Sequence, residues 1–219
     1  MRWMLLVLLL GVAVVPGVAL AAPAAPAAVA VDRVVAVVGN TPIAASQVQF
    51  EREVGERIAG DGCTPSFGRL LCEERAPLER LIFRETLRQA GLAKGIEVSL
   101  GTLETADGAF EHTFPVRDGK RQFLARWGLG AGDFREFLLD VARLDQAIEV
   151  AVGRLVREVS EEEERRYYGE NADTIFGGRP YEEVAAMVSR RYYALKFERT
   201  YGSWASELRA SSRVRYIGR

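Results

Sequence analysis

Few side chains of this chain could carry catalysis or hold a metal ion. The sequence has one histidine, His112, and two cysteines, Cys63 and Cys72, among its 219 residues. A structural zinc site takes four ligands, most of them Cys or His, and a Ser-His-Asp triad needs a histidine beside its nucleophile. His112 follows Phe110-Glu111 near the end of an expected helix, which indicates an ordinary surface or capping role. We therefore predict neither a metal site nor a cofactor.

Two further patterns resemble ion-binding motifs at first sight. The acidic run Glu161–Glu164 could surround a cation, but it directly follows Ser160 and matches the acidic first turn of a helix. The glycine-rich stretch 128–132 follows no β-branched strand and lacks the Lys-Ser/Thr pair of a phosphate-binding loop. The net charge of −1 leaves no basic excess to attract phosphates, so we expect no nucleic-acid partner.

The first 21 residues have the three parts of a secretory signal peptide. A positively charged start precedes an apolar region over residues 5–15, and residues 19–21 form a small-x-small cleavage site. Pro16 interrupts the apolar run before it reaches the roughly 20 residues that a membrane-spanning helix needs. We therefore expect export to the periplasm, no stable membrane insertion after cleavage, and a flexible spacer over residues 22–30.

In an oxidising compartment, Cys63 and Cys72 are expected to form a disulfide. The bridge would close a loop of about ten residues and contribute roughly 2.5 kcal/mol through the entropy of the unfolded chain. The pair lacks the C-x-x-C spacing and the βαβ surroundings of a redox-active motif. We interpret it as a structural staple.

The stretch from Val31 to Gln49 is the one around which the fold is organised. Its β-branched run Val34–Val38 predicts a buried strand, followed by a Gly-Asn turn and a short second strand that contains Pro42. At the other end of the chain, residues 213–217 alternate polar and apolar side chains as a half-buried strand does. Because a lone hairpin is only marginally stable, we expect the C-terminal strand to pair with it.

Helical spacing of apolar residues fills most of the chain between these strands. Capping boxes are predicted at Ser46, Asp133 and Ser160, and an N-cap at Ser99. The expected helices run from 47 to 59, from 77 to 94, from 99 to 115, from 120 to 127, from 133 to 158, from 160, and from 180 to the final strand with a bend at Gly202. The predicted fold class is mainly α, with one domain over residues 31–219 and a small sheet joining its two ends.

Five stretches, taken in chain order, resemble the SurA-like family of periplasmic chaperones. They are VDRVVAVVGNTPIAASQVQ, LIFRETLRQAGLAKGIEVS, DFREFLLDVARLDQAI, VSEEEERRYY and SWASELRASSRVRYI. The resemblance implies an N-terminal helical part over residues 31–168, and a C-terminal helix with a closing strand over residues 180–219. These stretches are distributed, with gaps between them, from residue 31 to residue 217 of the chain that follows the signal peptide.

The chain also departs from that family. In SurA-like proteins the fourth stretch usually leads into a parvulin-type prolyl isomerase domain. Here only residues 169–179 separate it from the last helix, whereas such a domain needs about a hundred residues. We interpret 169–179 as a linker in place of the isomerase domain, and we expect no enzyme. The resemblance then implies an ATP-independent chaperone for unfolded or partly folded envelope proteins, including outer-membrane proteins. The alternative is a non-catalytic structural partner in an envelope or secretion complex.

Binding of unfolded polypeptides calls for aromatic side chains in an adaptable cleft. Tyr192 and Tyr193 are adjacent and cannot share one helix face, so one is expected inside and the other exposed or lining a cleft. The candidate peptide-binding residues are Tyr167, Tyr168, Phe176, Tyr193 and Phe197. The other interpretation, that these rings pack a core, stays open at this point, as does the oligomeric state.

Overall fold

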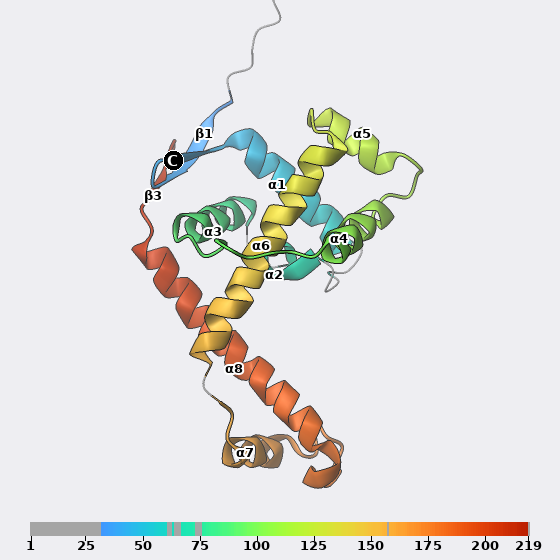
Figure 1. Cartoon of the computed structure of the whole chain (residues 1–219), viewed down its shortest axis with the longest axis vertical. Helices are drawn as coiled ribbons and strands as arrows, with labels where there is room; N and C mark the ends of the chain where they lie inside the picture. Colours follow the sequence, from blue (N-terminus) through green and yellow to red (C-terminus); the bar gives the residue numbers. More distant parts are fainter. Residues whose placement is uncertain (1–31, 61–62, 64–66, 73–75, 157, 219) are drawn as a thin grey trace, which may run out of the picture. The chain divides into compact units, whose positions relative to one another are not determined.

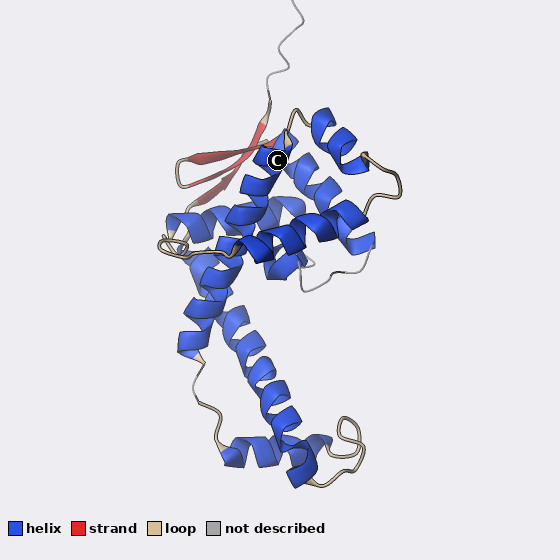
Figure 2. Ribbon diagram, turned by 45° about the vertical axis from the view of Figure 1, so that its right-hand side comes forward, coloured by secondary structure: helices blue, strands red, loops and turns tan. Residues whose placement is uncertain are grey.

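The computed structural model describes residues 32–60, 63, 67–72, 76–156 and 158–218. The expected signal peptide (1–21) and spacer (22–30) lie outside the described residues. The described part is mainly helical with a small three-stranded antiparallel sheet, which confirms the predicted fold class at that level (Figures 1 and 2).

The sheet joins the two ends of the described chain. Strands β1 (Val34–Val38) and β2 (Thr41–Ala44) form the predicted hairpin, and β3 (Val214–Tyr216) pairs antiparallel with β1, in the order β2-β1-β3. Gly39 takes the left-handed conformation that the tight turn requires, with φ of +56°. The predicted pairing of the closing strand with the N-terminal hairpin is confirmed.

Eight helices lie in the part of the chain that the structure describes (Figure 1). They are α1 (Ala45–Gly60), α2 (Gly68–Cys72), α3 (Pro77–Gln89), α4 (Leu100–His112), α5 (Gly119–Arg126), α6 (Ala131–Leu155), α7 (Glu161–Asn171) and α8 (Tyr181–Ser211). Helix α8 is continuous through Gly202. No helix within the described ranges is long and apolar enough to cross a membrane.

Of the four predicted capping residues, two are correct and two are wrong. The side chains of Ser99 and Ser160 accept the backbone N–H groups of Thr102 and Glu163, as a capping residue should. Ser46 instead donates hydrogen bonds from its backbone N–H and its hydroxyl to the carboxylate of Asp32. At the start of α1 it is the side chain of Gln47 that accepts the backbone N–H of Ala44. Asp133 is the third residue of α6, where its carboxylate accepts the N–H of Gly130. In both corrections the helix begins earlier than its capping pattern indicated.

Two segments differ most from the prediction. No helix was predicted between residues 59 and 77, but this region contains the short helix α2, which starts at Gly68 with φ of +69°. The carboxylate of Asp145 on α6 caps that helix by accepting the N–H of Leu70 at 2.9 Å. Helix α3 stops at Gln89, five residues before its predicted end at Lys94, because the chain turns at Gly91.

Three groups of buried apolar side chains form the interior of the described chain. The largest takes residues from α1 to α6 and from α8 at Phe197, Tyr201 and Ala205. A second lies between the sheet and α3 around Val38 and Ile82. The third belongs to α7, the following turn and the start of α8, with Phe176, Val184 and Val188 buried. We call α1–α6, the sheet and residues 197–211 of α8 the helical body, and residues 160–196 the α7–α8 hairpin.

Candidate functional site

Three of the five candidate aromatic residues meet in the α7–α8 hairpin. The ring of Phe176 lies 6.1 Å from that of Tyr167 and 5.8 Å from that of Tyr168, measured between ring centroids. Phe176 is only 2% exposed, whereas the two tyrosines are half-buried. The candidate residue Phe176 is therefore a core residue, because the turn after α7 folds back and makes this ring the centre of a small core.

The segment 169–179, interpreted from the sequence as a linker, has a defined fold in this structure. Its first residues complete α7, which ends at Asn171. The hydroxyl of Tyr168 donates a hydrogen bond of 2.7 Å to the carbonyl oxygen of Arg179. The segment thus connects α7 to α8 as part of a helical hairpin with its own apolar interior.

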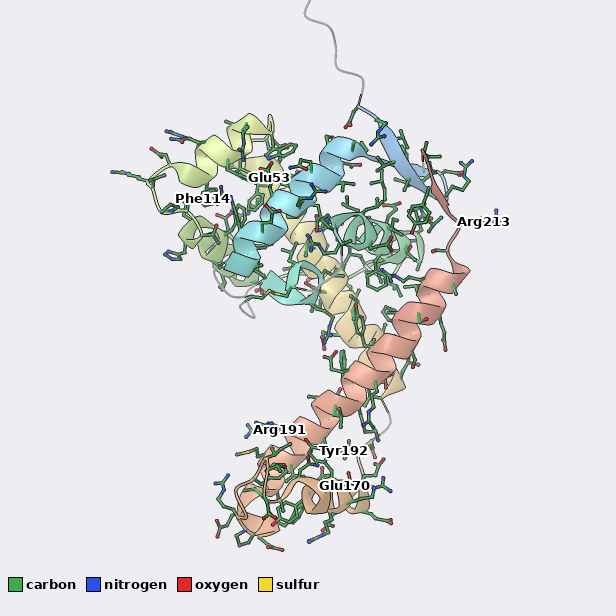
Figure 3. All side chains as sticks on the ribbon, turned by 180° about the vertical axis from the view of Figure 1, so that it is seen from behind. Glu53, Phe114, Glu170, Arg191, Tyr192 and Arg213 are labelled. Carbon is green, nitrogen blue, oxygen red and sulfur yellow. A yellow bond between two sulfur atoms is a disulfide. The ribbon has the colours of Figure 1, made fainter. Side chains whose placement is uncertain are left out.

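The adjacent tyrosines of α8 point in different directions, as helical geometry requires. Tyr192 is half-buried and stacks on Tyr167 at 5.2 Å between centroids, and Figure 3 shows it on the side of α8 that faces α7. Tyr193 is 45% exposed, and its hydroxyl lies close to Gly153 of α6. Of the five candidates, Tyr193 is the one whose ring is open to solvent.

Phe197, the remaining candidate, belongs to the core of the helical body. It is 5% exposed, and the guanidinium carbon of Arg69 lies 5.2 Å from its ring centroid. Of the two interpretations left open for Phe197, the structure shows the core role, because this turn of α8 packs against α2 and α6. A ring in that place supports the fold and is not accessible to a client.

Two other exposed apolar side chains lie near the C-terminal end of α6. Leu155 and Val150 are 54% and 38% exposed. Leu155 also lines a shallow pocket of about 360 Å³ together with Thr200 and Trp204 of α8. Leu155 and Tyr193 therefore place accessible apolar surface on both helices where α6 meets α8.

Polar contacts hold α7 against α8. The carboxylate of Glu163 accepts the backbone N–H of Ser160 at 3.0 Å and the ammonium of Lys196 at 3.2 Å. The bond from Ser160 and the contact with Lys196 both hold the pKa of Glu163 below its ordinary value. Tyr181 adds a bond from its hydroxyl to Glu164 at 3.1 Å. The hairpin therefore depends on a few polar links close to its surface.

A buried charge cluster lies between α1 and α3. The carboxylate of Glu51 on α1 is 1% exposed and binds the guanidinium groups of Arg80 and Arg84 on α3. Arg80 donates from Nε to Oε1 of Glu51 at 2.8 Å and from Nη2 to its backbone oxygen at 2.9 Å. Gly55 leaves room for this contact, since a Cβ atom there would lie 2.5 Å from Nη2 of Arg80.

Sequence reasoning missed this cluster, although a signal for it exists. Glu51 occupies the same helix face as Val54 and Ile58, which are core residues of α1. Arg84 likewise lies one turn before the buried Leu87 on α3. A charged residue at a core position of an apolar stripe indicates a buried ion pair, because an unpaired charge would be too costly there.

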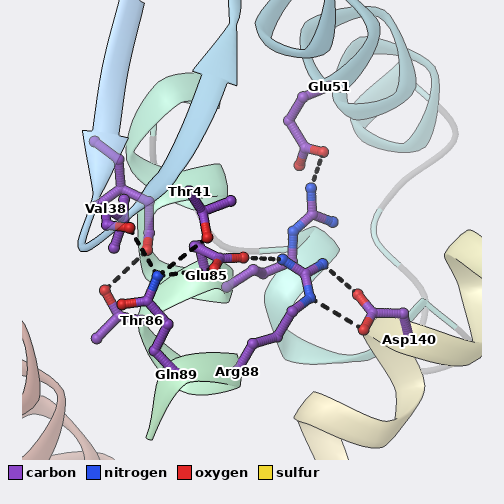
Figure 4. Close-up of polar contacts among 10 residues, drawn as sticks. Val38, Thr41, Glu51, Glu85, Thr86, Arg88, Gln89 and Asp140 are labelled. Carbon is purple, nitrogen blue, oxygen red and sulfur yellow. Dashed lines mark hydrogen bonds and ion pairs between the residues drawn. The ribbon is translucent and has the colours of Figure 1, made fainter.

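Arg84 is the more deeply buried of the two arginines in this cluster. Burial lowers the pKa of its guanidinium, and the contact with Glu51 opposes that effect. Its guanidinium carbon lies 5.2 Å from the ring centroid of Phe137 on α6. Arg88, one turn further along α3, is held by Asp140 of α6 and by Glu85 (Figure 4). These contacts tie α3 to both α1 and α6.

A pocket of about 350 Å³ adjoins this cluster. Phe50, Leu81, Trp127, Leu129 and Phe137 supply its apolar lining, and Glu51 and Arg84 are among its polar residues. The rings of Trp127 and Phe137 each meet Phe50 edge-on at 5.6 Å between centroids. None of the five predicted aromatic candidates lines this pocket.

The chemistry-bearing residues of the sequence take structural places in the fold. Cys63 and Cys72 are joined by a disulfide with their Cα atoms 5.6 Å apart. His112 is the last residue of α4 and is exposed. Within the described ranges, no group of three or more His, Cys, Asp or Glu side chains is arranged to hold a metal ion.

Comparisons with known proteins add no family to this picture. No family model matches the chain. A search of curated proteins finds no match either.

Proposed function

We propose that the chain is an exported, ATP-independent chaperone that binds unfolded or partly folded envelope proteins without catalysis. The observation that carries the proposal is the antiparallel pairing of β3 with β1. That sheet closes a helical body from the two ends of the described chain, which is the arrangement expected from the resemblance to SurA-like proteins. The order of the helices between the strands supports the same interpretation.

The contact between α6 and α8 is the binding surface that we propose. Tyr193 and Leu155 expose apolar area there. Charged side chains accompany them and keep the surface hydrated: Arg154 precedes Leu155 in the sequence, and Arg199 lines the same pocket as Leu155. An unfolded chain that covers such separate apolar spots binds weakly at each one, and it is kept from pairing its strands with other chains.

The burial of the other aromatic residues favours the second candidate function. Phe176 and Phe197 are core residues, and Tyr167 and Tyr168 are half-buried. Only one of the five candidate rings, that of Tyr193, is exposed to solvent. Such a surface also fits a non-catalytic structural partner in an envelope or secretion complex. Such a partner would bind one folded protein and would not suppress the aggregation of unrelated unfolded chains.

Aggregation of an unfolded outer-membrane barrel protein, followed by light scattering, tests the proposal. Tyr193→Ala should raise the amount of chain needed for half-protection about fivefold, which corresponds to about 1 kcal/mol of lost contact. Its melting temperature should stay unchanged, because the ring is open to solvent. Val116→Ser is the matched control, since Val116 is also apolar and 59% exposed but lies between α4 and α5.

The two functions give opposite results in this assay. Protection by the unaltered chain that falls in Tyr193→Ala and not in Val116→Ser supports the chaperone. If the unaltered chain gives no protection at a severalfold molar excess, the chaperone function is rejected and the structural partner remains.

A further inference from the structure

The disulfide between Cys63 and Cys72 fixes the shortest helix of the described chain. Helix α2 has five residues, far fewer than an isolated helix needs to be stable in water. Cys72 is its last residue, and the bridge ties it to Cys63, shortly after the end of α1. Phe67, Leu70 and Leu71 add buried apolar contacts. The position of α2 therefore depends on this packing together with one covalent bond.

Helix α2 in turn holds α8 through Arg69. The two Nη atoms of Arg69 donate to the two carboxylate oxygens of Glu198 at 2.9 and 2.7 Å, the paired arrangement in which guanidinium–carboxylate contacts are strong. These hydrogen bonds hold the pKa of Glu198 below its ordinary value. In addition, Asp145 of α6 accepts the N–H of Leu70. The short helix thus lies at the junction of α6 and α8.

The guanidinium of Arg69 also covers two aromatic rings of α8. Its central carbon lies 5.2 Å from the ring centroid of Phe197 and 4.5 Å from that of Tyr201. Both rings are buried, and only 23% of the Arg69 side chain is exposed. The ring of Phe197 lies 6.5 Å from the exposed ring of Tyr193. If Arg69 moves away, the apolar surface at Tyr193 extends to Phe197 and Tyr201.

The bridge limits how often α2 can open. A bridge across about ten residues makes the open state roughly 70-fold less populated, the equivalent of about 2.5 kcal/mol in chain entropy. Reduction removes that restriction. The burial of Phe67, Leu70 and Leu71 does not require the bridge, so α2 stays closed most of the time in both states. What changes on reduction is the fraction of time for which α2 is open, and with it the exposure of the rings below Arg69.

The two cysteines differ in their access to solvent. Cys63 is exposed, whereas Cys72 is half-buried and packs against the core. A thiolate that approaches from solvent therefore attacks Sγ of Cys63: a new S–S bond forms there, the old one breaks, and Cys72 leaves as a thiolate that takes a proton from water. The second thiol of the same reductant then attacks the mixed disulfide, releases Cys63 as a thiol and becomes a disulfide with the first. Two electrons pass from the dithiol to the bridge.

We propose that the Cys63–Cys72 bridge is a redox switch: a dithiol reductant opens it, and α2 then releases Arg69 from Phe197 and Tyr201 more often. The bridge is the substrate of this exchange and not its catalyst, which agrees with its lack of C-x-x-C spacing. The partner implied is a protein dithiol of the compartment in which the chain resides. The switch does not depend on the chaperone function, because the uncovered rings are measured on the chain alone.

Hydrogen exchange of the full chain, read by mass spectrometry before and after reduction with dithiothreitol, tests the switch. After reduction, amides of residues 69–72 should exchange at least tenfold faster, and those of residues 197–205 at least threefold faster. Amides of α3 should exchange as before, because α3 is held by α1 and α6. Reoxidation with glutathione disulfide should restore the slow rates. The double variant Cys63→Ala, Cys72→Ala should behave like the reduced chain without any reductant.

Arg69→Ala separates the cover from the bridge. With the disulfide intact it should already expose the two rings, so the fluorescence of anilinonaphthalene sulfonate should rise at least twofold and reduction should add little. Glu198→Gln weakens the same contact more gently and should act in the same direction. Arg126→Ala is the matched control, because Arg126 of α5 also binds a carboxylate, Glu53 at 2.7 Å, and lies over a ring, Phe123 at 5.5 Å. That variant should respond to reduction as the unaltered chain does.

The outcomes decide between a switch and a simple staple. Faster exchange confined to α2 and residues 197–205, together with loss of the dye response to reduction in Arg69→Ala, supports the switch. If reduction speeds exchange equally in α2 and α3, or leaves α2 unchanged, the bridge does not control α2 by itself and the proposal is overturned. It is likewise overturned if Arg69→Ala and Glu198→Gln respond to reduction as fully as the unaltered chain.

Discussion

The helical body and the α7–α8 hairpin are stabilised in different ways. The body has a continuous apolar core in which Phe110 meets Phe114, Phe123 and Phe134 at ring distances of 5.3, 5.9 and 4.6 Å. It also has the buried charge cluster of Glu51 and a disulfide. The hairpin has a core centred on Phe176 and a few polar links near the surface.

This difference indicates a division of roles within the chain. A region with few buried apolar contacts opens locally at a lower free energy than the region around it. We expect the hairpin to change conformation while the body keeps its fold. Tyr193, the exposed ring of the proposed binding surface, lies within the hairpin at its contact with α6. Adaptable segments suit a protein that binds many unfolded sequences.

The largest effect on the whole molecule is expected from Glu51→Gln. The substitution leaves the buried Arg84 without the carboxylate that it pairs with, which should lower the free energy of unfolding by about 3–5 kcal/mol. Glu163→Gln in the hairpin is the matched control and should leave the global transition unchanged, because its carboxylate is near the surface. Urea denaturation followed by far-UV circular dichroism measures both. A loss below about 1 kcal/mol in Glu51→Gln would mean that the cluster does not hold the body together.

The next effect is a local one, expected from Phe176→Ala. Removing a fully buried ring costs about 3–5 kcal/mol where the site cannot collapse, which is enough to unfold a small hairpin. Trypsin should then cleave after Arg165 or Arg179 at least tenfold faster, while the melting temperature of the body stays within about 2 °C. Phe110→Ala serves as the comparison and should lower that melting temperature clearly. If Phe176→Ala lowers it by as much as Phe110→Ala, the two regions unfold as one unit.

The smallest effect is expected from acid. The pKa of Glu163 lies below its ordinary value of 4.5, so its contribution to stability is present above that pH and is lost as the pH falls through the lowered pKa. The loss should loosen the packing of Tyr167 on Tyr192 before the helices of the body melt. Near-UV circular dichroism of the tyrosines should therefore change at a higher pH than the far-UV signal. Glu163→Gln should remove the separation between the two curves.

Local patterns in the sequence predicted much of the body. The strand Val34–Val38, its turn and the closing strand were predictable because a β-branched run, a Gly-Asn pair and period-2 alternation are all local signals. Ser99 and Ser160 were predictable as caps for the same reason. Helix α2 was missed because its five residues are too few for a periodic pattern, and its cap, Asp145, is 75 residues away in the sequence.

The candidate site was less predictable, because burial depends on tertiary packing. Tyr193 and Phe197 are one turn apart on α8, yet the first is exposed and the second is in the core. Composition alone could not separate them, since α8 passes from the hairpin into the body between these two residues. The pairing of Glu51 with Arg84 spans 33 residues and two helices, so it too follows from packing.

Hydrogen exchange read by mass spectrometry, with and without an unfolded outer-membrane barrel protein, tests the division of roles most directly. Without the client, backbone amides of α7 and of residues 181–195 should exchange faster than those of α3 and α6. With the client, amides around Tyr193 should become protected and those of α3 should not change. Equal exchange in the two regions, with no protection near Tyr193 on adding the client, would contradict the account.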